Sequence, residues 1–162
     1  MKRLFSLFIL LILVGLVKVS ADNATTVKDS LLKVLNSQPK GESRLNTLYS
    51  LARLDQMSPS CVYYLGKLLD EATELDDKKN QCLAMYAHVV YYYNHQDEDS
   101  TTVWMNKLAS VALKHKYYKY YFSGKRADIA MHTIKHKIEY SITEAEEMYK
   151  LAEELDNTQG MI

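Results

Sequence analysis

Three equivalent stretches decide the fold: 60-SCVYYLGKLLDEATEL-75, 100-STTVWMNKLASVALKH-115 and 140-YSITEAEEMYKLAEEL-155. They begin forty residues apart, and mostly apolar or small residues fall at the same places in each. In the first copy these places are Leu65, Leu68, Ala72 and Leu75, which are separated by three, four and three residues. Side chains at that spacing share one face of an α-helix. The three stretches therefore predict three equivalent helices.

Apolar residues at helical spacing also mark the segments before and between these stretches. They predict further helices at residues 25–35, 44–56, 79–96 and 117–136. The chain has only 2 Pro and 5 Gly among 162 residues, which favours long helices over a strand-rich fold. A polar connector at residues 96–100 precedes the second stretch, and Asp99 or Ser100 is expected to cap the helix that follows. We therefore predict an all-α fold of seven helices.

The forty-residue period is typical of stacked helical hairpins. A single hairpin cannot bury both of its apolar faces, so neighbouring hairpins must pack together. We expect residues 22–162 to form a right-handed α-α superhelix (solenoid) of antiparallel hairpins, with the helix at 25–35 as half of an incomplete opening repeat. Gly160 lies eighty residues, or two repeats, beyond Asn80, where a helix is expected to begin. We therefore expect a truncated form of a longer protein; the alternative is a partner that covers this end.

Residues 1–21 have the three parts of a secretory signal peptide. Lys2 and Arg3 precede an apolar run, and Val19-Ser20-Ala21 offers small residues for cleavage. The apolar run at 4–17 is shorter than the roughly 20 residues of a membrane-spanning helix, although a retained anchor is the alternative. The segment carries three basic residues and no acid, and the whole chain is neutral, so the mature chain has a net charge of −3. A nucleic-acid partner is not expected, because phosphate binding normally requires a basic excess.

Two cysteines and two histidines were considered as chemical sites. Cys61 and Cys82 fall near the starts of consecutive antiparallel helices, about 20 Å apart. A disulfide requires Cα atoms within about 7 Å, so both thiols are expected to be unpaired core residues. His132 and His136 would share a helix face, but a metal site needs further ligands, and solvated or packed histidines are expected instead.

The stretch 91-YYYNHQDEDSTTVWMNKL-108 resembles the join between the two helices of a tetratricopeptide repeat. Aromatic residues end the first helix, and an acidic turn, a small residue and a large apolar residue follow. The forty-residue spacing and the scarce Gly and Pro make this a longer, divergent tetratricopeptide-like class; HEAT-like repeats are the alternative. Joined to an export signal, the repeats also resemble the periplasmic sensor region of bacterial membrane-bound histidine kinases and related regulators. That resemblance implies a periplasmic or extracytoplasmic location at the inner membrane and a membrane-spanning helix further along the chain.

The resulting functional hypothesis is an exported protein-interaction or sensing module of a signal-transduction protein. Its ligand, a protein or peptide, would bind in the concave groove lined by the first helices of successive hairpins. The expected groove residues are Tyr49, His88, Tyr92 and Asp128. No catalytic motif, phosphate-binding loop or cofactor motif is found, so no catalytic residue, cofactor or metal is expected. The alternatives are a structural spacer for an output domain and a small secreted enzyme.

Overall fold

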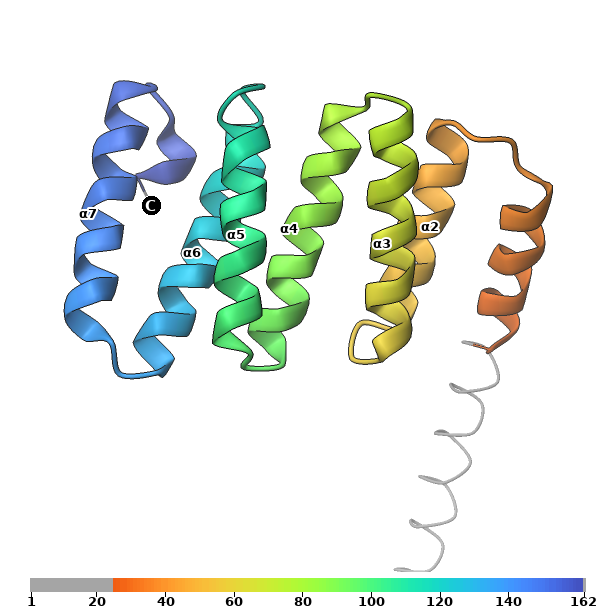
Figure 1. Ribbon diagram of the computed structural model, residues 1–162, viewed down its shortest axis with the longest axis horizontal. Helices are drawn as coiled ribbons and strands as arrows, with labels where there is room; N and C mark the ends of the chain where they lie inside the picture. Colours follow the sequence, from red (N-terminus) through yellow and green to blue (C-terminus); the bar gives the residue numbers. More distant parts are fainter. Residues whose placement is uncertain (1–24, 162) are drawn as a thin grey trace, which may run out of the picture. The chain divides into compact units, whose positions relative to one another are not determined.

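The computed structural model describes residues 25–161, and it is entirely helical there, with no strand among these residues (Figure 1). The all-α prediction and the expected number of seven helices are thus confirmed. The predicted signal peptide at residues 1–21 lies outside the described residues. None of the helices within 25–161 is both long and apolar enough to cross a membrane.

The chain divides into two compact units, one ending at Pro39 and the other running from Lys40 to Ile162. In the first unit, residues 25–37 form one helix. The second unit holds the six other α-helices and a short 3₁₀-helix near its end. Their bounds are α2 Glu42–Leu54, α3 Pro59–Glu74, α4 Lys78–Asn94, α5 Glu98–Ala112, α6 Tyr118–Ile134, α7 Ile138–Glu154 and η1 Thr158–Gly160.

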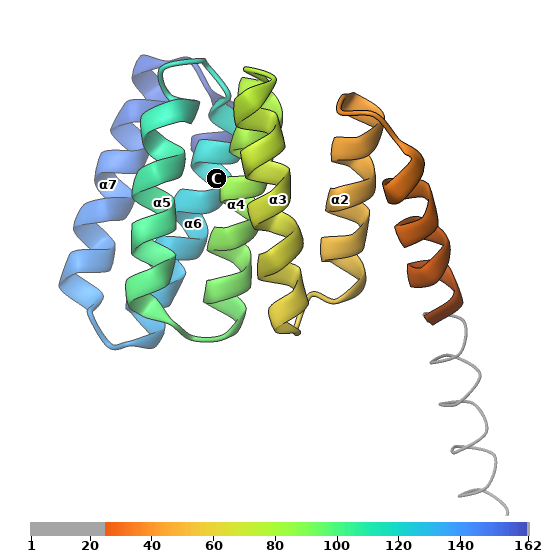
Figure 2. The same ribbon diagram turned by 45° about the vertical axis from the view of Figure 1, so that its right-hand side comes forward.

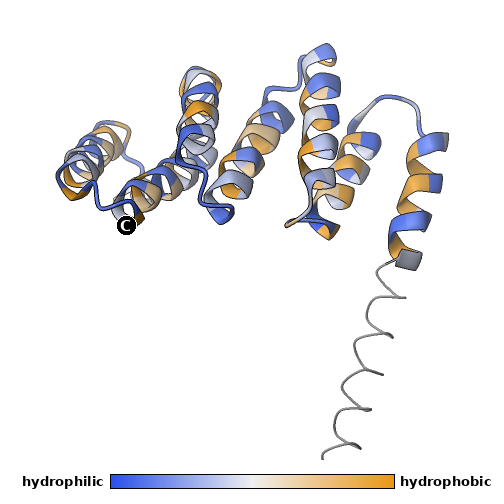
Figure 3. Ribbon diagram, turned by 60° about the horizontal axis from the view of Figure 1, so that its bottom comes forward, coloured by the Kyte–Doolittle hydropathy of each residue, from blue (hydrophilic) through white to orange (hydrophobic). Residues whose placement is uncertain are grey.

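In the second unit each helix packs against the next helix in the chain, and α4 also packs against α6. Figures 1 and 2 show successive helices side by side and running in opposite directions. Every one of these helices carries both hydrophobic and hydrophilic residues (Figure 3). Most of the predicted stripe residues form the core: Leu65, Leu68, Ala72, Leu108 and Ala112 are almost completely buried. Leu75 is an exception, because it is the C-cap of α3 and is 42% exposed. Burial of this face drives each helix against its neighbours.

The helix ends repeat every twenty residues. The five non-glycine residues with positive φ occupy equivalent positions: Asp76, Gln96, Lys116, His136 and Asp156. In each case the next residue donates its N–H to the carbonyl five residues back, as in Asp77 N to Ala72 O at 2.8 Å. This is the Schellman motif, which satisfies the last carbonyls of a helix and reverses the chain. The connections from α3 to η1 therefore share one backbone design.

Side-chain caps support the starts of three helices, α3, α4 and α5. The Asp97 carboxylate accepts hydrogen bonds from the Ser100 N–H at 3.0 Å and from the Ser100 hydroxyl at 2.8 Å. Asp97 is therefore the N-cap of α5, and the expectation of Asp99 or Ser100 is wrong. The reason is that the preceding Schellman motif positions the residue right after Gln96 as the cap.

The cysteines are as expected: Cys61 and Cys82 are both free and buried. Cys82 is completely buried in the core formed by α4, α5, α6 and α7. Burial raises the pKa of its thiol to about 11. The thiol is therefore protonated at neutral pH and acts as a small apolar group.

Candidate functional site: a tyrosine-walled groove

The strongest candidate site is a hollow of about 260 Å³ between α2 and α4, with α3 beneath it. We call it the α2–α4 groove. Helices α4 and α6 pack against each other. Between α2 and α4, by contrast, there is a hollow, and residues of α3 line its floor. The lining residues are Tyr49, Ala52, Arg53 and Gln56 from α2 and its end, Cys61 and Leu65 from α3, and Tyr86, Ala87, Val90, Tyr91 and Asn94 from α4.

The groove has an apolar floor and amphipathic walls. Leu65 and Cys61 are buried at the floor, while Tyr49 and Tyr86 on the walls are half-buried. Burial, assisted by the charge of Asp55, raises the pKa of the Cys61 thiol, so the floor carries no thiolate near neutral pH. Small side chains at Ala52 and Ala87 leave room between the walls. Tyrosine hydroxyls offer hydrogen bonds beside an apolar surface, which suits a protein or peptide ligand.

Aromatic contacts hold the α4 wall of the groove in place. The Tyr91 ring lies 4.1 Å from the His95 ring in a stacked arrangement and 5.2 Å from the Tyr92 ring, edge to face. His95 is fixed in turn by a hydrogen bond between Nδ1 and the Tyr91 carbonyl at 2.8 Å. Desolvation raises the pKa of the Tyr91 phenol, which keeps its hydroxyl protonated. Tyr91 is therefore a neutral, pre-oriented contact residue.

Arg53 supplies the charge of the groove. It is exposed at the end of α2, and it is the charged side chain among the described residues that line the hollow. Asn94 and Gln56 add amide donors and acceptors at the same edge. The groove thus combines apolar, aromatic and polar contacts within one hollow, and contains no pair of titratable groups suited to proton transfer.

The four residues expected to line the groove lie in three places. Tyr49 lines the α2–α4 groove. His88 is 2% exposed and its ring stacks on Trp104 of α5, with centroids 3.8 Å apart. The Tyr92 ring is also stacked with His88, with centroids 6.2 Å apart. Asp128 is buried and accepts a hydrogen bond from Thr102 of α5 at 2.9 Å. His88 and Asp128 face α5 because they occupy the register of the buried Leu48, forty and eighty residues on.

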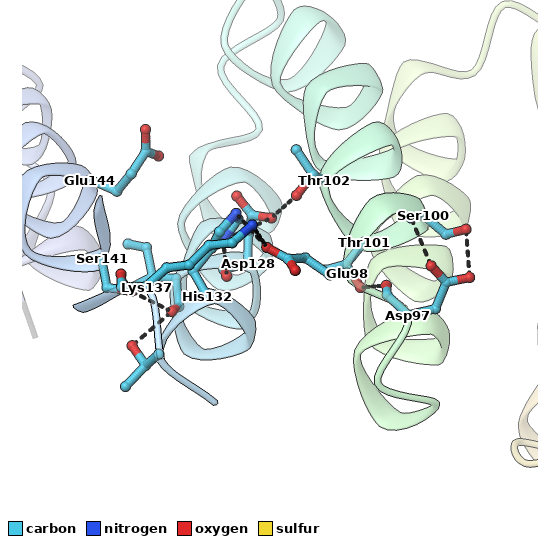
Figure 4. A network of polar contacts seen from close by, with 12 residues as sticks. Asp97, Glu98, Ser100, Thr101, Thr102, Asp128, His132, Lys137, Ser141 and Glu144 are labelled. Carbon is cyan, nitrogen blue, oxygen red and sulfur yellow. Dashed lines mark hydrogen bonds and ion pairs between the residues drawn. The ribbon is translucent and has the colours of Figure 1, made fainter. Parts of the chain in front are cut away.

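Asp128 belongs to a polar network that joins α5, α6 and α7 (Figure 4). His132 Nδ1 hydrogen-bonds to the Asp128 carbonyl at 2.8 Å, and His132 Nε2 lies 3.5 Å from Glu98 Oε1. Lys137, just before α7, donates to the same Glu98 oxygen at 2.5 Å. This hydrogen bond lowers the pKa of Glu98 and raises that of Lys137. The network thus fixes the ends of three helices.

A second ion pair lies deeper in the same network. Lys125 of α6 pairs with Glu144 of α7, and its Nζ lies 4.0 Å from Asp128 Oδ2. Burial lowers the pKa of Lys125, although Asp128 and Glu147 oppose this effect. Within residues 25–161 no group of three His, Cys, Asp or Glu side chains is arranged to hold a metal ion. His136 lies apart from this network, exposed in the turn before α7.

Of the residues that line the groove, the sequence predicted only Tyr49; Arg53, Tyr86 and Tyr91 are the main polar and aromatic ones that it did not predict. Their signal was present in the helix that precedes each core stripe. Tyr49, Ala52, Arg53 and Gln56 follow one another at spacings of three, one and three residues, so they form a second face beside the buried one. A comparison of the chain with family models, with curated proteins and with solved structures finds no match.

Proposed function

We propose that the unit Lys40–Ile162 is a helical-repeat module that binds a protein or peptide ligand in the α2–α4 groove. In this proposal the hairpins stack as a right-handed superhelix of the divergent tetratricopeptide-like class. Equal turns at twenty-residue intervals from α3 onward support a regular stack, because like connections give successive helix pairs similar geometry. The packing of α4 on α6 supports first helices that line a common face.

The observation that carries the proposal is the groove itself. Tyrosines form both of its walls, and the floor is apolar and sealed by Leu65 and Cys61. Aromatic residues are enriched at protein interfaces, where they bury apolar area and still donate hydrogen bonds. A structural spacer needs no such hollow. We further propose, from the resemblance and the N-terminal segment, that the module acts outside the cytoplasm as the sensing or docking part of a signalling protein.

The test is a selection of binding peptides from a random library displayed on phage, with the full chain as the target. Selected peptides are measured by fluorescence anisotropy against the original chain and the double variant Tyr49→Ala/Tyr91→Ala. We expect the affinity to fall by about tenfold or more, since truncated interface tyrosines commonly cost that much. Tyr63→Ala is the matched control, because Tyr63 is 60% exposed on α3 and does not line the groove. Equal affinities for the original chain and the double variant would refute the proposal.

A further inference from the structure

Helix α7 exposes an apolar stripe that a soluble surface helix does not need. Ile138, Ile142 and Tyr149 are 49%, 55% and 46% exposed, with the half-buried Ala145 among them. The four residues are separated by four, three and four positions, so they share one face of the helix. We call this face the α7 stripe. The short helix η1 packs against the end of α7, where Gly160 lies against Ala152, three residues beyond Tyr149, and against Phe122 of α6. Ile138, Ile142 and Tyr149 remain exposed.

On α5, the residues forty positions before those of the α7 stripe are covered by the next helix, α6. Thr102, forty residues before Ile142, donates its hydrogen bond to Asp128 of α6. Met105, forty before Ala145, is almost fully buried and lies so close to Gly124 of α6 that a Cβ there would be 3.0 Å from its sulfur. These positions of α5 are thus a surface on which a helix lies.

On α3 the register is again covered. Leu65 is completely buried, and Leu69 packs against the core cluster that contains Met85 of α4. The residues at this register in α3 and α5 therefore contact the helix that follows in the chain. The α7 stripe repeats the register with larger side chains at two of its positions, since Ile142 and Tyr149 stand where α5 has Thr102 and Ala109. The α7 stripe is accordingly suited to the docking of one more helix.

Acidic residues mark one edge of the α7 stripe. Glu139, Glu146 and Glu153 are all exposed and follow at intervals of seven residues, so they form a row parallel to the stripe. Lys150 is the one basic residue within α7, against six glutamates. A helix that lies on the stripe must bring its own edge next to this row. Cationic side chains at that edge are attracted, and anionic ones are repelled.

We propose that the α7 stripe binds an amphipathic helix of another protein, one with an apolar face and basic residues along its edge. The apolar face supplies the contact area and the basic edge selects the partner and its register. Anionic membrane surfaces are disfavoured by the same row of glutamates. This site is separate from the α2–α4 groove, whose lining includes no residue of α7.

The test uses two synthetic amphipathic helices, each as long as α7, with the same leucine stripe. One carries lysine along its edges and the other carries glutamate. Binding of each labelled peptide to the full chain is measured by fluorescence anisotropy. The variants are Ile142→Ser/Tyr149→Ser, which removes the apolar stripe, and Glu139→Gln/Glu146→Gln/Glu153→Gln, which neutralises the acidic row. The control is Tyr63→Ser/Val103→Ser, which removes two equally exposed apolar side chains outside the stripe.

We expect the lysine peptide to bind the original chain and the control equally, and the stripe variant about tenfold more weakly or worse. The row variant should lose most of the preference for lysine over glutamate, and added salt should have the same effect. The substituted residues are exposed, so the variants should keep the circular dichroism of the original chain. Equal binding to the stripe variant, or no preference between the peptides, overturns the proposal. A dimer of the original chain that Ile142→Ser/Tyr149→Ser dissolves in analytical ultracentrifugation also overturns it, because the occupant is then a second copy.

Discussion

The substitution Gln96→Gly should stabilise the protein, although glycine is usually a destabilising residue. Gln96 has φ 55°, in the left-handed region, and its side chain is exposed. It stands at the C′ position of the motif in which Asp97 N donates to Tyr92 O at 3.1 Å. Glycine is the residue that normally occupies this position, because it has no Cβ to clash with the following carbonyl.

The size of the effect follows from two opposing costs. A residue with a Cβ loses about 1–2 kcal/mol in the left-handed conformation. Glycine removes this loss but gives up about 0.5–1 kcal/mol through the greater freedom of the unfolded chain. The net gain should be about 0.5–1 kcal/mol. For a chain of this length a change of 1 kcal/mol moves Tm by about 2–4 °C.

The assay is equilibrium unfolding in urea with matched thermal scans of the full chain. Lys116→Gly and His136→Gly at the equivalent positions should give gains of similar size. The double variant Gln96→Gly/Lys116→Gly should be close to additive, because these two turns lie at opposite ends of α5. Lys150→Gly is the control; it is exposed within α7 and should lose about 0.5–1 kcal/mol through poorer helix propensity. A loss of stability in Gln96→Gly as large as that of Lys150→Gly would refute the assignment of these turns.

Three further predictions test the core. Gly124→Ala should cost about 1–3 kcal/mol in urea unfolding, since its Cβ would lie 2.7 Å from Leu108 Cδ2, whereas Gly66→Ala, with open space around it in α3, should gain about 0.5–1 kcal/mol. Burial, with a smaller contribution from Lys107, lowers the pKa of His88 from 6.5 to about 4. The unfolded chain therefore binds the proton more readily, and stability should fall by about 3 kcal/mol as the pH drops from 6.5 to 4; His88→Phe should flatten this step in unfolding curves measured against pH. Cys82 should resist iodoacetamide at about pH 8 until urea unfolds the chain, because its pKa of about 11 and full burial suppress the thiolate; rapid labelling of the folded chain, read by mass spectrometry, would contradict this.

The sequence was sufficient for the helices because burial follows a simple period. Leu68, Leu108 and the equivalent Met148 fall on one face of three helices, and all three are buried. Helix ends were harder to predict, as the caps illustrate. Asp97, Asp99 and Ser100 are all chemically able to cap α5, and the choice among them is made by the turn before the helix. The sequence offers no glycine to mark that turn.

The groove could be predicted only in part, because its residues come from three helices. Tyr49 was found since the first helices of hairpins were expected to line the concave face. His88 was chosen by the same reasoning, and yet it is buried and stacks with Trp104 and Tyr92. The two residues differ by one position in the register of their helices, and one position turns a side chain by about 100°. Sequence spacing alone does not determine which of two adjacent faces meets the second helix.

The sequence repeats every forty residues, whereas the backbone turns repeat every twenty. This difference shows which helices carry the variable side chains. The turns after α3, α4, α5, α6 and α7 are the same, but the residue five before the end of the Schellman motif alternates. It is alanine in α3, α5 and α7, and a larger group, Tyr92 or His132, in α4 and α6. Alanine lets the second helices approach their neighbours closely, since Ala72, Ala112 and Ala152 are completely buried. Of the larger rings, His132 contacts Glu98 in the acidic first turn of α5, and Tyr92 stacks on His88 of its own helix. The regular backbone therefore carries two kinds of helix. The variable side chains are concentrated on the first helices of the hairpins, and two of these, α2 and α4, supply most of the α2–α4 groove.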